Sequence, residues 1–195
     1  MYEIVTAAGS PDWSCVKKER LSQCSWSPNP APEADFQAVY MQNGHLVFRL
    51  TSHASPTRAV NFEPDTNVWE DSCLECFLSF DGKRYMNLEV NSNSAMRAGF
   101  GTCRFDRTLL LNLGVPMPKV CASLGEAEWS VIYDIPPETI VSLFGMQPGK
   151  GSVFWGNFYS CGDKTPFPHY SAWNRIYTEF PDFHRPEFFG SLVIV

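Results

Sequence analysis

The residues whose types and spacing could do chemistry are concentrated between positions 68 and 91. There, an aromatic ring, carboxylates and amides alternate with apolar residues; the polar set is Trp69, Glu75, Tyr85, Asn87, Glu89 and Asn91. Such a set suits a neutral polyol, because the ring stacks on its C–H face while polar groups pair with its hydroxyls. The pattern therefore indicates a binding surface for a small polar ligand.

The period-two alternation predicts that this stretch is a β-hairpin of two half-buried strands. A two-residue turn at Asp81-Gly82 would place Leu74 on the same face as Glu89, which buries a carboxylate in the core. A three-residue loop over 80–82, with Gly82 at positive φ, separates the polar and apolar faces. This register predicts that Glu75 lies beside Asn87 and diagonally near Glu89.

Composition restricts the class of protein. The 195 residues are 44% hydrophobic and 14% aromatic, which predicts one domain over 1–195 with a sizeable core. The net charge of −6 argues against nucleic acid and anionic membranes as partners. No apolar run is long enough for a transmembrane helix, and the start lacks signal-peptide features. A cytoplasmic protein is expected, or a secreted or periplasmic one if a signal was removed; oligomeric state is not predicted.

The seven cysteines show no disulfide-scaffold spacing. Cys73 and Cys76 have the spacing of a C-x-x-C motif. Positions three apart on a strand point to opposite faces, however, so this pair cannot easily hold one metal ion. The four histidines also show no metal-ligand spacing. Plain free thiols are therefore expected, and no metal is assigned.

The rest of the chain predicts many short strands. Strand-like runs occur at 36–42, 45–52, 57–62, 72–80, 84–91, 95–104, 118–123, 127–134, 152–161 and 188–195. Residues 1–35 are interpreted as an irregular leader packed on the domain, and one short helix is expected near 136–144. The long connection 162–187 is expected to be functional. Together these elements predict an all-β, antiparallel β-sandwich.

Five motifs resemble those of family 9 carbohydrate-binding modules, including stand-alone bacterial ones. They are V-W-E-D-S-C-L-E-C-F-L at 68–78, Y-M-N-L-E-V-N at 85–91, G-N-F-Y-S-C-G-D at 156–163, H-Y-S-A-W at 169–173 and P-D-F-H-R-P-E-F-F-G at 181–190. The resemblance covers about 36–195. It implies a distorted, jelly-roll or immunoglobulin-like β-sandwich that binds mono- and disaccharides or glycan ends without catalysis.

The resemblance also implies a site. The sugar would lie between two facing rings, Trp69 and Trp173, with Glu75 and Arg97 on its hydroxyls. Tyr170 lies where the family has an amide partner, with Asn157 or Asn174 as the alternatives for that role, and Asn87 is added from the hairpin. Some members hold structural calcium, which is not placed here, and no other cofactor is expected.

Two other functions remain open at this point. Related modules are attached to xylanases, and Glu75 with Glu89 could act as the paired carboxylates of a glycoside hydrolase. An aromatic patch on a β-sandwich could also bind another protein.

Overall fold

The computed structural model describes residues 1–27 and 29–195; Pro28, within the predicted leader, lies outside the described residues. Most of the chain is β-strand. The strands are β1 Tyr2–Ala7, β2 Glu19–Arg20, β3 Ala34–Met41, β4 Leu46–Ser52, β5 Cys73–Ser79, β6 Tyr85–Asn91, β7 Met96–Cys103, β8 Asp106–Leu109, β9 Lys119–Leu124, β10 Trp129–Ile135, β11 Val153–Cys161, β12 Tyr170–Ala172 and β13 Gly190–Ile194. The helices are α1 Leu110–Leu113 and α2 Pro137–Phe144, with 3-10 turns η1 Val68–Glu70 and η2 Pro186–Phe188. Among the described residues, no helix has the length and apolarity needed to cross a membrane.

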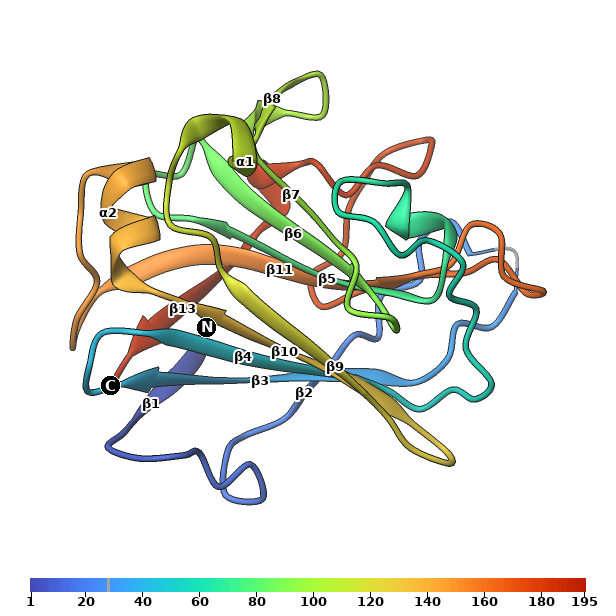
Figure 1. The fold of residues 1–195 in the computed structure, drawn as a ribbon, viewed down its shortest axis with the longest axis horizontal. Helices are drawn as coiled ribbons and strands as arrows, with labels where there is room; N and C mark the ends of the chain where they lie inside the picture. Colours follow the sequence, from blue (N-terminus) through green and yellow to red (C-terminus); the bar gives the residue numbers. More distant parts are fainter. Residues whose placement is uncertain (28) are drawn as a thin grey trace.

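The strands pair in the order β8-β7-β6-β5-β11-β13-β1-β3-β4-β10-β9, with β12 on β11 and β2 on β3. The path forms two layers because β1 changes partner along its length: residues 2–4 pair with β13 and residues 5–7 pair with β3. Figure 1 shows β5 to β8 and β11 lying over β3, β4, β9 and β10. The predicted β-sandwich is confirmed. Its strands are mixed rather than strictly antiparallel, because β1 is parallel to both neighbours.

The interpretation of residues 1–35 as an irregular leader was wrong for its first part. β1 is an inner strand, and its Tyr2 and Ile4 side chains are fully buried. Its partners β13 and β3 are remote in sequence, so no local hairpin signal marked β1 as a strand. Later leader residues do pack on the sandwich: Gln23 pairs with Ala172, and the Trp26 indole donates to the Thr178 carbonyl at 2.8 Å.

The main core lies between the two layers. The inward face of β5 and β6 contributes alternate apolar residues, namely Leu74, Cys76, Leu78, Met86, Leu88 and Val90. They meet rings from the other layer, and Phe36 of β3 stacks on Phe158 of β11 at 3.9 Å between centroids. This assigns one face of the predicted hairpin to the core, as its alternation requires.

Other elements differ in detail from the prediction. The helix expected near 136–144 is confirmed as α2, which ends at Gly145 in the left-handed conformation (φ 73°). Residues 57–62, predicted as a strand, form a loop instead, because their backbone amides bond to the Asp71 carboxylate rather than to a neighbouring strand. β8, β12 and α1 were not predicted, since three or four residues give no readable period.

Neighbouring residues of β1 test its contribution to the fold. Replacing the buried Ile4 by alanine should lower the free energy of unfolding by about 2–4 kcal/mol, because it leaves a cavity between the layers. The control Val5→Ala, at a side chain 42% exposed on the same strand, should cost less than about 0.5 kcal/mol. Urea denaturation measures both, and equal costs would contradict the inner position of β1.

Candidate functional site

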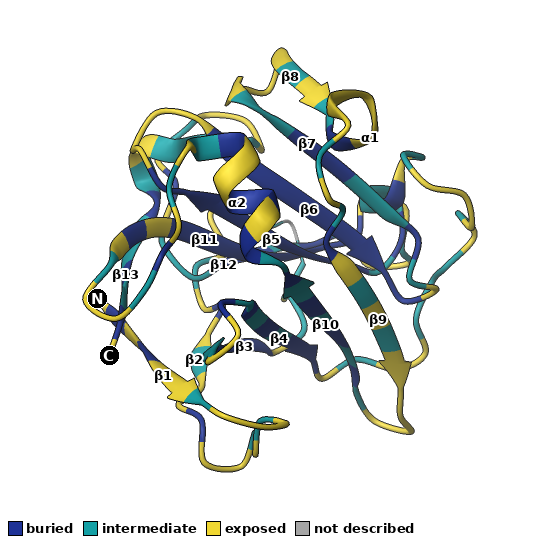
Figure 2. Ribbon diagram, turned by 60° about the vertical axis from the view of Figure 1, so that its left-hand side comes forward, coloured by how far each residue is buried: buried dark blue, intermediate teal, exposed yellow. Residues whose placement is uncertain are grey.

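The outer face of β5 and β6 carries the polar half of the hairpin pattern. Its side chains look exposed in the sequence but are buried, and Figure 2 shows both strands dark along their length. Glu75 and Glu89 are each 3% exposed, and Asn87 is fully buried. The cover includes Tyr159, Phe183 and Phe189, which pack with Phe77 and Tyr85 in a second apolar cluster.

A cavity of about 230 Å³ opens above this face. Its floor contains Glu75, Glu89 and Cys161. Its walls come from three separate segments, which contribute Trp69 from η1, Arg104, Phe105 and Arg107 from the β7–β8 hairpin, and Asp163, Tyr170, Pro181, Asp182, Phe183 and His184 from the stretch between β11 and β13. The pocket is therefore a meeting point of remote parts of the chain, and the predicted functional connection 162–187 supplies one side of it.

Strand register explains the floor. Glu75 lies directly opposite Glu89 on β6, and Asn87 lies opposite Phe77. The predicted division into two faces is confirmed, but the predicted pairing of Glu75 with Asn87 was wrong by two residues. The loop between β5 and β6 spans 80–84 rather than 80–82, and any odd loop length preserves the faces. Gly82 does adopt positive φ, at 72°.

The two floor carboxyl groups differ in their partners. Burial, and then the neighbouring Glu89 charge, raise the pKa of Glu75 well above its usual value. Its Oε1 accepts a hydrogen bond from the Cys161 thiol at 3.1 Å. Glu89 is also shifted upward in pKa by burial, but the Arg107 guanidinium opposes the shift.

Glu89, Asn87 and Arg107 form a closed triangle. The Asn87 amide donates to Glu89 Oε1 at 2.8 Å, and Arg107 Nη1 donates to Asn87 Oδ1 at 2.9 Å. Arg107 Nη1 also lies 3.4 Å from Glu89 Oε1. Asn87 therefore orients Glu89 and Arg107 at the pocket, although it does not line the pocket itself. Gly99 leaves room for it, since a Cβ there would lie 2.9 Å from Asn87 Oδ1.

Trp69 stands at the pocket wall, and Arg97 fixes its ring. The Arg97 guanidinium lies 5.3 Å from the centre of the Trp69 ring, within cation–π range. Its Nη1 also donates to the Asp65 carbonyl at 2.6 Å. Arg97 borders a second, smaller cavity beside Arg104 and Arg107 rather than the main pocket. It thus positions Trp69 from outside the pocket.

The predicted pairing of Trp69 with Trp173 is not what the structure shows. Tyr170 and Ala172 of β12 lie opposite Cys161 and Tyr159, on the pocket face of the sheet. Trp173, three positions after Tyr170, points to the other face by strand alternation. Its ring packs into the main core, 5.0 Å from Phe36 and 5.8 Å from Phe158. Tyr170 does line the pocket, as predicted.

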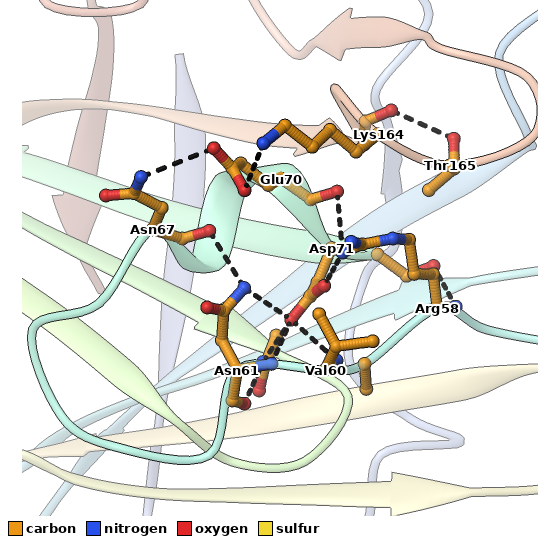
Figure 3. Close-up of polar contacts among 12 residues, drawn as sticks. Arg58, Val60, Asn61, Asn67, Glu70, Asp71, Lys164 and Thr165 are labelled. Atoms are coloured by element: carbon orange, nitrogen blue, oxygen red, sulfur yellow. Dashed lines mark hydrogen bonds and ion pairs between the residues drawn. The ribbon is translucent and has the colours of Figure 1, made fainter.

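The buried Asp71 carboxylate is the centre of a hydrogen-bond network (Figure 3). Asp71 directly follows η1, the turn that carries Trp69, so the network holds that turn in place. The carboxylate accepts hydrogen bonds from the Val60 and Asn61 backbone amides at 3.1 and 3.0 Å and from the Asn91 side chain at 2.8 Å. The Arg58 guanidinium completes the set. A calcium cage needs several oxygen ligands around the ion, whereas these groups are N–H donors with an arginine as the cation. The Asp71 cluster therefore does not fit calcium.

The same turn is tied to the segment after β11. The Trp69 and Glu70 carbonyls accept from the Asp163 and Lys164 amides at 3.1 and 3.0 Å. The Lys164 ammonium also pairs with the Glu70 carboxylate at 3.0 Å (Figure 3). Two of the segments that line the pocket are thus hydrogen-bonded directly to each other.

Sequence reasoning missed Arg107, Arg104 and Phe105 as pocket residues. They belong to the short β7–β8 hairpin, where the ladder is irregular between Gly101 and Cys103. The available signal was the compact run Arg104-Phe105-Asp106-Arg107, which has the polar composition of a hairpin tip. His184 also lies at the pocket, with its Nδ1 3.0 Å from the Tyr85 hydroxyl.

Fold and site together define a two-layer β-sandwich with a preformed polar and aromatic pocket on the outer face of one sheet. The family model of carbohydrate-binding family 9 matches residues 12–194. The chain belongs to this family, as its motifs suggested. A comparison with curated proteins found no match.

Solved structures share the whole architecture. A protein of Bacteroides uniformis, named as a candidate carbohydrate-binding protein, superposes with a TM-score of 0.83 at 27% identity, covering 99% of this chain and 98% of its own. A family 9 module of Caldicellulosiruptor kristjanssonii, solved with glucose, gives 0.66 at 14% identity over 99% and 95%. The cellotriose complex gives the same score and identity over 98% and 93%. At 14% identity the likeness concerns the fold.

The Asp71 network makes a prediction about stability. Asp71→Ala should lower the free energy of unfolding by about 2–4 kcal/mol, because it removes the buried carboxylate that pairs with Arg58 and accepts from the Asn91 amide and from two backbone amides. Chemical denaturation measures the loss. The control is Glu126→Ala at an exposed carboxylate, which should change stability by less than about 0.5 kcal/mol. A similar small effect for both would show that the network contributes nothing.

His184 predicts a pH dependence. Burial, and then the Arg107, Arg104 and Arg97 charges, lower the pKa of His184 from 6.5 to about 2. The folded state thus excludes a proton that the unfolded chain binds below about pH 6.5, so stability falls as the pH falls. The stability advantage of wild type over His184→Asn should shrink by about 1.4 kcal/mol per pH unit below that point.

Urea titrations of both proteins at pH 7.5, 6 and 5 measure this trend, at points chosen to bracket the imidazole pKa of about 6.5 in an unfolded chain. Subtracting the variant cancels the titration of the other groups. A constant difference across the series would mean that His184 is protonated as readily in the folded protein as in the unfolded chain.

Proposed function

We propose that this chain binds a small sugar or a glycan end in the pocket above β5 and β6, without catalysis. The observation that carries the proposal is the Trp69 ring beside the Glu75 and Glu89 carboxyl groups in one preformed cavity, in a member of carbohydrate-binding family 9. A few polar groups that converge in a largely apolar, preformed pocket are typical of small-molecule sites.

Trp69 is the proposed stacking platform. Arg97 and the Asp71 network hold its ring and backbone before any ligand arrives. A fixed ring loses little conformational freedom on binding, which favours affinity. The C–H face of a pyranose ring would lie against it.

The floor supplies hydroxyl partners. Glu75, whose carboxyl pKa burial raises well above its usual value, and Glu89 both offer oxygen acceptors to the sugar hydroxyls. Arg107 donates from the side and is itself oriented by Asn87. Hydrogen bonds of this kind gain strength in a partly desolvated pocket, so a sugar ring would be fixed in orientation.

Phe105 is the proposed second apolar contact, in the role expected of Trp173. It lines the pocket from the tip of the β7–β8 hairpin and is 94% exposed, so a ring face is available. Phe183 is less suited, because it already stacks on Tyr159 at 4.1 Å between centroids.

Calorimetric titration with glucose and cellotriose tests the proposal; these are the ligands present in the two Caldicellulosiruptor kristjanssonii complexes. Trp69→Ala should weaken binding at least about tenfold, or about 1.4 kcal/mol, since it removes the stacking surface. The matched control is Trp173→Phe. Trp173 was expected to pair with Trp69 but packs in the core, so its replacement should leave the affinity for sugar within about threefold of wild type. Equal affinity of wild type and Trp69→Ala would refute the pocket as the sugar site.

One observation favours a second candidate, a glycoside hydrolase. Glu75 and Glu89 face each other across adjacent strands, and Glu75 has the raised pKa that a general acid needs. Release of reducing sugar from cello-oligosaccharides by wild type, lost in Glu75→Gln, would establish that activity. Binding without such release supports the non-catalytic function.

A further inference from the structure

Two thiols and a carboxyl group converge on the outer face of the sheet. The ligand atoms of Cys73, Glu75 and Cys161 all lie within 4.8 Å of one another, and all three side chains are buried. Cys161 Sγ and Glu75 Oε1 are 3.1 Å apart. The cluster is independent of the aromatic and arginine groups of the proposed sugar site.

Strand geometry produces this cluster. Cys73 of β5 lies directly opposite Cys161 of β11, so their side chains share a face. Glu75, two residues along β5, lies on the same face. Cys76, the second cysteine of the C-x-x-C spacing, faces the main core instead. The relevant thiol pair is therefore one that the linear sequence does not display.

The donor set identifies the class of ligand. Two thiolates and a carboxylate suit a borderline-soft divalent ion such as zinc, whereas calcium and magnesium prefer oxygen alone. Zinc binds sulfur at about 2.3 Å and carboxylate oxygen at about 2.0–2.2 Å, which places ligand atoms about 3.5–4 Å apart around a tetrahedral centre. The observed separations are within small side-chain movements of that arrangement.

The pocket provides access and the remaining coordination position. Glu75 and Cys161 line the cavity, while Cys73 is buried and does not border it. An ion held by the three side chains would have its fourth position on the pocket side, where water or a ligand hydroxyl can bind. Three protein ligands and one exchangeable position are typical of open zinc sites.

We propose that Cys73, Glu75 and Cys161 form a binding site for a zinc-class divalent cation, with its fourth coordination position open to the pocket. Binding releases the protons of the two thiols and of the carboxyl group, and no electron is transferred. A bound ion would link the end of β11 to the start of β5 at the floor of the proposed sugar pocket.

Cobalt(II) is the probe, because thiolate coordination gives it an intense near-ultraviolet charge-transfer band and a tetrahedral environment gives strong visible bands. Reduced full-length protein, freed of reductant, should show both at one cobalt per chain, and zinc should displace them. Cys73→Ser and Cys161→Ser should each weaken cobalt binding at least about tenfold.

The control replaces the four exposed cysteines, Cys15, Cys24, Cys103 and Cys121, by serine, and it should bind cobalt like wild type. Circular dichroism and thermal melting of each variant show whether it is folded. A folded, reduced wild type without a thiolate band would overturn the proposal, and so would a band that is lost in the four-cysteine control. Formation of a Cys73–Cys161 disulfide in place of metal binding would appear in the mass of the oxidised protein and would also overturn it.

Cys73 also separates this proposal from sugar binding. It does not border the pocket, so a folded Cys73→Ser variant titrated with glucose in the presence of a chelator should bind as wild type does under the same conditions. Loss of the cobalt bands in that variant therefore reports on the metal site alone, and failure of sugar binding in wild type leaves the cobalt result unaffected.

Discussion

The outer face of β5 and β6 is polar and yet buried, and a buried polar group is stable only where it has a hydrogen-bonding partner. The two floor carboxyl groups meet this requirement in different ways. Glu89 accepts from Asn87 of its own strand and pairs with Arg107 of the β7–β8 hairpin, and Glu75 accepts from Cys161 of the neighbouring strand β11. The pocket is the space above this floor that η1, the β7–β8 hairpin and the stretch between β11 and β13 enclose.

The same constraint fixes the aromatic wall. The Asp71 carboxylate sets the position of η1, which presents Trp69, and backbone hydrogen bonds from η1 reach the segment after β11. Arg97 then holds the ring. A site fastened to a sheet in this way is rigid before ligand arrives, so its specificity depends on which groups are preorganised rather than on movement.

Burial also changes the chemistry of the groups at the pocket. Burial raises the pKa of Glu75, and the Glu89 charge adds to that shift while Arg107 opposes it. Burial lowers the pKa of His184, and the neighbouring arginines act in the same direction. The pocket therefore combines carboxyl groups, arginines and an imidazole that resists protonation. Membership of carbohydrate-binding family 9 agrees with that character, although the second tryptophan expected from the motifs belongs to the core.

The sequence by itself determined the sandwich class, the hairpin with its two faces, α2 and the family, because alternation, helix-terminating residues and motifs are local signals. It limited the hairpin loop to an odd length but did not choose between three and five residues, so the partner of Glu75 was misassigned. Only the tertiary structure decided that Trp173 turns into the core, that Arg107 reaches Glu89, and that Cys73 meets Cys161. These depend on which remote strands pair and in which register. Side-chain periodicity assigns each residue to a face of the sheet, but it does not identify the partner strand.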